Sequence, residues 1–343
     1  ICFFNMIILY TLLTIILLLM IWELIMLFLV RNPKVLQKLW RGAKNSIGYL
    51  YVHGERKNMV YREDASQYDP ELGYTLKPGK FIYTEREFSN SYFVNSLGVR
   101  DTEDALVAPD IVIVGDSLAL GWGVDQEKTF AKLLENKIRL KILNTSLPDY
   151  GTVRQMLILR KVDRSRLQCL VIQCSNNIYN ENLKFCLNDN RLQIMREATY
   201  HQLAQINNLP KKYYFGKFVF MRIKKKLDGL QSKPVAAEKK INISEEDLFL
   251  NVLKHHEDLL ASVPVIIVLL LNEKHKSDYF VNSLKQKIAE ASNPPFIRRM
   301  IVLNAMQHIT ENDFYLMDNH LNDHAHVILA DLLEQTFREQ KII

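Results

Sequence analysis

Ser117 is the first residue whose position suggests chemistry. It follows Gly115 and Asp116, directly after the apolar run IVIV at 111–114. A glycine there permits a tight turn from a strand into a helix, and a serine near a helix N-terminus lies where backbone N–H groups favour developing negative charge. Asp and Ser are also ordinary helix caps, so the triplet by itself predicts no more than a capped helix.

A histidine and an aspartate two residues apart form the second candidate, in the run DNHLN at 318–322. A hydroxyl is a poor nucleophile until a base takes its proton, and that base needs a group that fixes its tautomer. His320 could be the base and Asp318 the orienting group for Ser117. The alternative for this run is a solvated polar loop before a helix.

Asn176 is the third candidate and follows the apolar run LQCLVIQC at 167–174. A side-chain amide at the end of a strand could donate a hydrogen bond to an oxyanion. The alternative is turn chemistry, because asparagine is common in turns.

Strand-like and helix-like segments alternate from residue 110 to the end of the chain. Apolar runs predict strands at 111–114, 140–144, 167–174, 265–271 and 300–304, and helices fit at about 127–138, 152–163, 244–261, 277–291 and 323–339. This alternation predicts an α/β fold in three layers, α/β/α, with a five-stranded parallel sheet. Ligands of such folds bind beyond the carboxyl ends of the strands, which is where the three candidates stand.

The N-terminal part of the chain is apolar over residues 6–30, with Glu23 as its one charge. As a helix, this run extends roughly 37 Å, which exceeds a hydrocarbon core of about 30 Å. We therefore expect a transmembrane helix that contacts membrane lipid, with a buried core helix as the alternative. A cleaved signal peptide usually has a shorter apolar run and a small-residue cleavage site, and neither is evident. Glu23 is interpreted as a tolerated charge near one interface, the alternative being a contact with a partner helix.

The net charge of +6 is concentrated in two segments. Residues 31–57 hold seven basic residues and one acid, and residues 201–240 hold ten basic residues and two acids, so the remainder of the chain is net acidic. This distribution argues against nucleic acid as a partner and for two basic patches that face anionic lipid. Within the second patch, the stretch YYFGKFVFMRIKKKL at 213–227 mixes aromatic and basic residues. It fits either contact with a membrane surface or an acidic polymer, or a solvated helix with an aromatic core face.

Four blocks taken together resemble the SGNH/GDSL hydrolases over about residues 66–340. VGDSLALGWGV resembles the nucleophile block and implies Ser117 as nucleophile, with its N–H in the oxyanion hole. CSNNIYNEN resembles the third block and implies Asn176 as an oxyanion donor. DNHLNDHAH resembles the last block and implies Asp318 and His320 as the orienting acid and the base. The resemblance also implies the flavodoxin-like fold of that family.

The second block, ILNTSLPDYGTVRQ, departs from the family at its glycine. Asp149 stands at that position, with Gly151 two residues later, and the resemblance implies that a backbone N–H of this turn serves the oxyanion hole. Asp149 has such an N–H, but a carboxylate beside an oxyanion is unfavourable. Two further departures are Asn177, where an Asp often follows the Asn, and Ala325, where a Gly usually precedes the final His.

Asp323 and His326 form a rival pair at a spacing that the family also uses. We prefer Asp318 and His320 because Asn322 then falls in register. His324, His326 and the pair His255-His256 could suggest a metal site, but no matching carboxylate or cysteine spacing accompanies them. We therefore expect neither a metal nor a cofactor.

The run YDPELGYTLKPGKF followed by NSLGVRD resembles a lead-in segment of membrane-anchored members of the family. The chain is thus expected to divide into a transmembrane helix at 6–30, a basic juxtamembrane linker at 31–65, a hairpin-like lead-in segment at 66–104, and a hydrolase-like domain at 105–340 with a basic insertion at about 187–243.

These observations predict a membrane-anchored serine esterase that acts on an ester-linked acyl group through Ser117, His320 and Asp318. One alternative is an O-acyltransferase or O-deacetylase whose substrate is an acylated glycan. Another is a catalytically inactive binding or scaffold protein of the same fold, which Asp149 and Asn177 keep open. The basic residues after the span place the domain in the cytoplasm by the positive-inside rule, whereas the resemblance implies the extracytoplasmic side, and both remain open.

Overall fold

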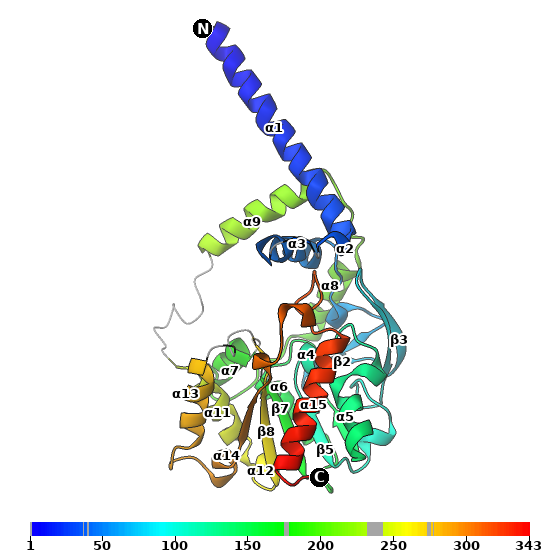
Figure 1. The fold of residues 1–343 in the computed structure, drawn as a ribbon, viewed down its shortest axis with the longest axis vertical. Helices are drawn as coiled ribbons and strands as arrows, with labels where there is room; N and C mark the ends of the chain where they lie inside the picture. Colours follow the sequence, from blue (N-terminus) through cyan, green and yellow to red (C-terminus); the bar gives the residue numbers. More distant parts are fainter. Residues whose placement is uncertain are drawn as a thin grey trace.

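The computed structural model describes residues 2–36, 38–39, 41–174, 178–231, 243–272, 276 and 278–343. A long N-terminal helix, α1 (Cys2–Arg31), extends away from an α/β domain that contains the C-terminus (Figure 1). An 18-residue window within Phe4–Arg31 of α1 has a mean hydropathy of 2.8, and this helix is long and apolar enough to span a membrane. A signal sequence meets the same criteria of length and composition.

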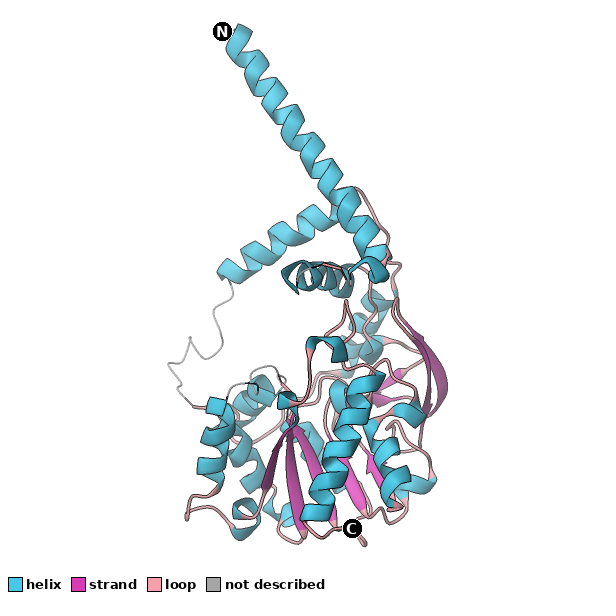
Figure 2. Cartoon of the chain, in the orientation of Figure 1, coloured by secondary structure: helices cyan, strands magenta, loops and turns pink. Residues whose placement is uncertain are grey.

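The centre of the domain is a five-stranded parallel sheet with the order β6-β5-β7-β8-β9 (Figure 2). Its strands are β5 (Ile111–Val114), β6 (Ile142–Asn144), β7 (Cys169–Cys174), β8 (Val265–Leu270) and β9 (Ile301–Asn304). The first strand of this sheet in the chain thus lies between the second and the third, which is the flavodoxin-like order. The predicted parallel sheet is confirmed, because strands covered on both faces read as continuous apolar runs.

Helices cover both faces of the sheet. Alternate side chains of β5 point to opposite faces, and each set belongs to a separate buried cluster. One cluster includes residues of α5 (Phe130–Ile138) and α15 (Asp323–Glu339); the other includes residues of α6 (Thr152–Arg160), α11 (Glu245–His255) and α13 (Asp278–Ile288). The fold is therefore the predicted α/β/α sandwich.

The chain leaves β5 toward β6 on one side and later returns to β7 on the other. The carboxyl ends of β5 and β7 therefore form the topological switch point, where neighbouring loops diverge and leave a crevice. Ser117 begins the short helix α4 (Ser117–Leu120) directly after β5. The strand order thus places Ser117 at this crevice.

Two antiparallel hairpins precede the sheet, in the segment expected to be hairpin-like. They consist of β1 (Ser66–Asp69), β2 (Gly73–Leu76), β3 (Gly79–Thr84) and β4 (Ser89–Val94). Their buried residues, including Tyr83 and Tyr92, belong to the same cluster as one face of the sheet. The hairpins are therefore part of the domain's core.

The segment 31–65, expected to be a linker, is mostly helical. It contains α2 (Pro33–Leu36), α3 (Arg41–Gly54) and η1 (Met59–Tyr61). A Cβ atom at Gly48 of α3 would lie 2.9 Å from the carbonyl oxygen of Met317. Helix α3 therefore packs directly on the loop that carries Asp318 and His320, and only a glycine permits this approach.

The remaining elements connect or flank these layers. They are α7 (Ile178–Leu187), α8 (Glu197–Asn208), α9 (Lys217–Gln231), α12 (Glu257–Leu260), α14 (Pro295–Arg298), η2 (Asp104–Leu106), η3 (Gln126–Lys128), η5 (Ala305–Gln307) and η6 (Glu311–Asp313). Helices α8 and α9 lie in the basic segment expected as an insertion at about 187–243.

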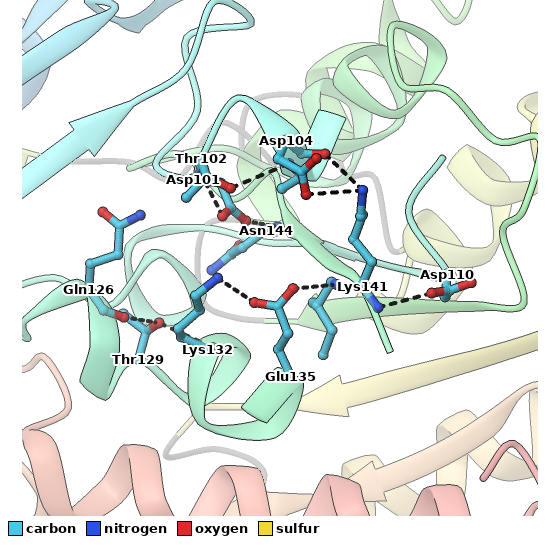
Figure 3. A network of polar contacts seen from close by, with 12 residues as sticks. Asp101, Thr102, Asp104, Asp110, Gln126, Thr129, Lys132, Glu135, Lys141 and Asn144 are labelled. Atoms are coloured by element: carbon cyan, nitrogen blue, oxygen red, sulfur yellow. Dashed lines mark hydrogen bonds and ion pairs between the residues drawn. The ribbon is translucent and has the colours of Figure 1, made fainter. Parts of the chain in front are cut away.

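Carboxylates hold β6, which is an edge strand. Three of them accept hydrogen bonds from backbone N–H groups of β6 and of the residue before it: Asp101 from Asn144, Glu135 from Ile142, and Asp110 from Lys141 (Figure 3). An edge strand otherwise leaves such groups unpaired. Asn144 in turn donates from Nδ2 to the carbonyl oxygen of Ala119 at 2.8 Å. The network therefore connects the edge of the sheet to the helix that begins at Ser117.

Among the carboxyl groups of this network, Asp101 is the one whose charged form burial disfavours most. Burial raises the pKa of Asp101 from 3.8 to about 6, although hydrogen bonds from Asn144 and Thr102 act in the opposite direction. A carboxyl group whose pKa is raised by folding contributes stability below its unfolded pKa, and this contribution is lost as the pH rises through its folded pKa.

We predict that Asp101→Asn changes the pH dependence of unfolding. The free energy of unfolding of the wild type, relative to D101N, should fall by about 3 kcal/mol between about pH 3.5 and pH 7, at about 1.4 kcal/mol for each unit of the pKa shift. Chemical denaturation of the two proteins in detergent, across this pH range, measures the difference. A difference that does not vary with pH would contradict the assignment of the cost to Asp101.

Candidate active site

The turn after β5 presents Ser117 at the start of α4. A Cβ atom at Gly115 would lie 2.6 Å from Gln173 Oε1, so only a glycine fits between the two strands there. The Asp116 N–H donates to the same Gln173 oxygen at 2.8 Å, and the Asp116 carboxylate accepts from the Leu118 N–H at 2.9 Å. Asp116 is therefore the helix cap that the triplet predicted, whereas the Ser117 hydroxyl has a different partner.

Ser117, His320 and Asp318 form a continuous chain of hydrogen bonds. Ser117 Oγ lies 2.8 Å from His320 Nε2, and His320 Nδ1 lies 2.6 Å from Asp318 Oδ1. A carboxylate only accepts hydrogen bonds, so the neutral imidazole that satisfies both contacts has its proton on Nδ1 and accepts the serine proton at Nε2. The three side chains thus lie in the order of a nucleophile, a general base and its orienting group.

Arg56 holds the other oxygen of the Asp318 carboxylate, with Nη1 at 2.6 Å from Oδ2. The Asp318 side chain is 5% exposed. Burial alone would raise the pKa of Asp318, but the attraction of His320 and Arg56 outweighs burial and holds that pKa well below its usual range. Asp318 is therefore ionised at neutral pH, as an orienting group for an imidazolium requires.

Trp122 covers one face of the imidazole. Its ring stacks on His320 with centroids 4.8 Å apart and an interplanar angle of 13°. The Arg56 guanidinium lies 5.2 Å from the Trp122 ring centroid. Together with the hydrogen bond to Asp318, this packing restricts the orientation of His320.

Arg56 and Trp122 are the residues of this site that the sequence analysis did not identify. Arg56 is one of seven basic residues in the segment 31–57, and nothing in its local sequence distinguishes it. Trp122 stands in the run GWG of the nucleophile block, between two glycines with φ of +79°. The signal that the sequence offered for Trp122 was a large aromatic residue between two glycines, which favour turns.

The second block lies beside the nucleophile turn, because the Leu147 N–H donates to the Gly115 carbonyl oxygen at 3.2 Å. Asp149 has a φ of +58°, a left-handed conformation that glycine adopts most readily. The glycine that the resemblance implies at this position would adopt this conformation without strain. The Asp149 side chain is exposed, and Gly151 caps α6. The oxyanion role of either N–H stays a prediction.

Asn176 and Asn177 lie outside the described residues. The described part of β7 ends at Cys174, and β7 pairs with β5 through Ile172 and Val114. The role of Asn176 as an oxyanion donor therefore stays a prediction.

The rival pair does not come together. Asp323 forms an ion pair with Lys128 at 2.7 Å. His326 is buried, its Nδ1 accepts a hydrogen bond from the Phe130 N–H at 3.0 Å, and burial lowers its pKa to about 3. His326 is therefore a neutral core residue, and Asp323 does not orient it.

No group of three His, Cys, Asp or Glu side chains that could hold a metal ion occurs within the described ranges. His324 Nδ1 lies 2.6 Å from Asp313 Oδ1. His255 and His256 lie beside each other and beside Phe185. His324 thus pairs with a carboxylate, whereas His255 and His256 make ring contacts.

A pocket of about 680 Å³ lies at the loops that carry Ser117 and His320, although neither of these two residues lines it. Its lining includes Leu118, Asn319 and Leu321, the sequence neighbours of Ser117 and His320. Polar side chains form much of the remaining wall: Lys44, Asn45, Glu87, Asn272, Lys276, Glu311, Asn312 and Asn322. Such a wall suits a ligand with many hydroxyl groups.

The fold and the site define an α/β protein of flavodoxin-like strand order with a Ser–His–Asp hydrogen-bond chain at the carboxyl edge of its sheet. Among solved structures, it is similar to a member of the lipolytic G-D-S-L family from Veillonella parvula, which is 12% identical, at a TM-score of 0.37 over 66% of this chain and 97% of that chain.

Carbohydrate esterases are also among the similar solved structures. A family 2 enzyme with a carbohydrate-binding domain from Corynascus thermopiles is 13% identical, at a TM-score of 0.38 over 67% of this chain and 65% of that chain. A family two carbohydrate esterase from Cellvibrio japonicus is 10% identical, at a TM-score of 0.36 over 68% and 62%. No family model and no curated protein matches the chain. Because these identities are low, the function has to be derived from the chain's own site.

We predict that Arg56 and Asp318 are energetically coupled. Arg56→Met leaves a buried carboxylate without its guanidinium and should reduce the free energy of unfolding by on the order of 3 kcal/mol. Asp318→Asn in the R56M background removes that charge, so its additional cost should be smaller than in the wild type. Denaturation of the four proteins of this double-mutant cycle in detergent measures the coupling.

The exposed pair of Arg338 and Glu334 provides the control, because Arg338 is 64% exposed. Arg338→Met should cost no more than about 1 kcal/mol. Additive effects of R56M and D318N would show that the two side chains are not coupled.

Proposed function

We propose that this protein is a serine esterase that cleaves an ester-linked acyl group through Ser117, His320 and Asp318. The observation that carries the proposal is the pair of contacts from His320, at 2.8 Å to Ser117 Oγ and at 2.6 Å to Asp318 Oδ1. A serine hydroxyl within reach of an oriented imidazole is the arrangement that activates a hydroxyl for acyl transfer.

The reaction proceeds in two acyl-transfer steps. Ser117 Oγ attacks the ester carbonyl carbon as its proton passes to His320 Nε2, which gives a tetrahedral oxyanion and an imidazolium facing the Asp318 carboxylate. The C–O bond to the leaving alcohol then breaks, and the imidazolium protonates that alcohol. Water attacks the acyl-enzyme in the same way, with His320 again as base, and releases the acid and free Ser117.

The oxyanion forms next to the first turn of α4. The Ser117 N–H belongs to the start of this helix, where backbone N–H groups point outward and stabilise negative charge. We propose that the Asn176 amide and an N–H of the turn at Asp149 and Gly151 complete this oxyanion hole. One preorganised donor of this kind typically accounts for about 10²–10³ in rate.

We predict that Ser117→Ala abolishes hydrolysis of a short-chain p-nitrophenyl ester and labelling by a fluorophosphonate probe, because both need the hydroxyl. Folding should be retained, since alanine fits at the first turn of a helix. Circular dichroism, ester turnover and probe labelling of the purified full chain measure the three properties. Ser165→Ala, at an exposed loop serine, is the matched control and should keep both activities.

Full activity of S117A would exclude Ser117 as the nucleophile. A wild-type protein that neither turns over esters nor reacts with the probe would instead favour an inactive binding protein of the same fold.

We predict that Asp318→Asn reduces the rate of ester hydrolysis by about 10⁴ while the hydroxyl at Ser117 remains. An asparagine can donate to His320 Nδ1 and so favours the tautomer whose Nε2 already carries a proton. Pre-steady-state kinetics with the p-nitrophenyl ester separates this loss in acylation from any change in substrate binding. A change of less than tenfold would contradict the orienting role of Asp318.

A second candidate function is transfer of an acyl group to or from a glycan hydroxyl. The pocket at the loops that carry Ser117 and His320 has a polar wall with several asparagines, which favours this candidate. In transfer, a sugar hydroxyl replaces water as the second nucleophile, with His320 still as base. Product formation that requires an added oligosaccharide acceptor would distinguish transfer from hydrolysis.

We further propose that α1 anchors the protein in a membrane as a single span. Its N-terminal side chains are exposed and apolar, and its last turns pack against α3 and α9. The basic residues after α1 favour a cytoplasmic domain, and protease protection in right-side-out vesicles would determine the side.

A further inference from the structure

Helix α9 has an apolar face that no described part of the chain covers. Phe220, Ile223 and Leu227 are 57%, 54% and 51% exposed. Their spacing of three and four residues places them in one stripe along the helix. On the opposite face, Phe218 is buried and Lys225 Nζ lies 3.9 Å from the Tyr49 ring centroid of α3. The stripe therefore points away from the protein.

Two exposed lysines border the stripe. At about 100° per residue, Lys224 and Lys226 lie on either side of the line through Ile223 and Leu227. Lysine stems can lie along an apolar surface while the ammonium groups reach polar headgroups. An apolar stripe with basic borders is the pattern of a helix that lies in a membrane interface.

Glu23 of α1 fixes the start of α9. Its carboxylate is fully buried and accepts hydrogen bonds from the Phe218 and Val219 N–H groups, each at 3.0 Å, and from the Tyr213 hydroxyl at 3.2 Å. The N–H groups of a first helical turn have no partner within the helix, and the positive end of the helix dipole favours a carboxylate there. Glu23 was expected to be a tolerated charge near an interface, but it is a specific contact to α9.

This contact sets the depth of α9 relative to α1. The residues of α1 from Phe4 to Trp22 are mostly exposed and apolar, and they extend about 28 Å at 1.5 Å per residue. This length is close to a hydrocarbon core of about 30 Å, and exposed apolar side chains continue beyond Glu23 at Leu24, Ile25 and Phe28. Helix α9 thus begins where a span of this length would leave the hydrocarbon. Tyr214 and Phe215, exposed at the same level, are the residue types that gather at membrane interfaces.

The direction of α9 also fits a helix that lies along the membrane surface. Helix α9 leaves α1 to one side, and α3 lies between it and the α/β domain (Figure 1). The free part of α1 extends away from α3 (Figure 1). Because α9 packs on α3 through the face of Phe218 and Met221, the stripe on its opposite face lies on the side away from α3.

We infer that α9 lies in the interface of a membrane with anionic headgroups, with Phe220, Ile223 and Leu227 in the acyl boundary and Lys224 and Lys226 at the headgroups. This inference rests on the proposal that α1 spans the membrane. An acidic polymer would leave the apolar stripe in water, whereas a bilayer buries it. Helix α3, which holds Lys44 and Asn45 of the pocket wall, then lies directly below the membrane surface.

Site-directed fluorescence in the reconstituted full chain tests the inference. In a background with Cys2 and Cys186 replaced by serine, Ile223→Cys is labelled with bimane and placed in nanodiscs that contain lipids with a nitroxide near the headgroup. Val107→Cys is the matched control. Val107 is 62% exposed and lies before β5, at the amino ends of the strands, whereas Ser117 lies at their carboxyl ends. Quenching at position 223 should be severalfold stronger than at position 107, and equal quenching would overturn the inference.

A label at a third position distinguishes a failure of this inference from a failure of the proposal that α1 spans the membrane. Leu13→Cys, near the middle of α1, should be quenched by lipids with a nitroxide near the chain terminus. Quenching at 13 without quenching at 223 overturns only the surface position of α9, whereas no quenching at either position overturns the span as well. Protection of position 223 from aqueous iodide without lipid quenching would indicate a protein partner and would also overturn the inference.

Charge is tested by lipid composition. Quenching at position 223 should increase when about one third of the lipid is phosphatidylserine, and Lys224→Gln with Lys226→Gln should abolish that increase. An increase that survives both substitutions would overturn the role of anionic headgroups.

Discussion

The buried charge of Asp318 is the constraint on which the site depends. A carboxylate out of water is tolerated only when charged or hydrogen-bonding groups surround it, and here His320 and Arg56 each take one oxygen. The two partners come from opposite ends of the chain, so satisfying one charge brings the segment after α3 onto the last loop of the sheet. The segment that follows α3 is for this reason a structural part of the site.

Ser117 is held by a second set of constraints, all of them around the carboxyl end of β5. The absence of a side chain at Gly115 lets Gln173 approach and accept the Asp116 N–H. Asn144 reaches from the edge strand to the carbonyl oxygen of Ala119. Thus β7 contacts the cap residue Asp116 and β6 contacts the short helix that begins at Ser117. These contacts fix the direction from which the Ser117 hydroxyl approaches the imidazole of His320.

The sequence was most informative where the signal was local. Buried parallel strands are apolar on both faces, so the run at 111–114 could be recognised. Ser117 follows this strand closely, at the edge where open α/β sheets bind ligands. Arg56 and Glu23 could not be found in this way, because their partners lie 262 and 195 residues away. A lone charged residue in a basic or apolar segment gives no periodicity that points to such a distant partner.

The position of Arg56 matters for anyone preparing a soluble fragment. A cut at Ser66, the start of the first hairpin, keeps all the strands that the structure describes together with Ser117, Asp318 and His320, but removes the guanidinium that pairs with the buried carboxylate. Lack of turnover in such a fragment would reflect the place of the cut, and the intact protein could still be an active enzyme.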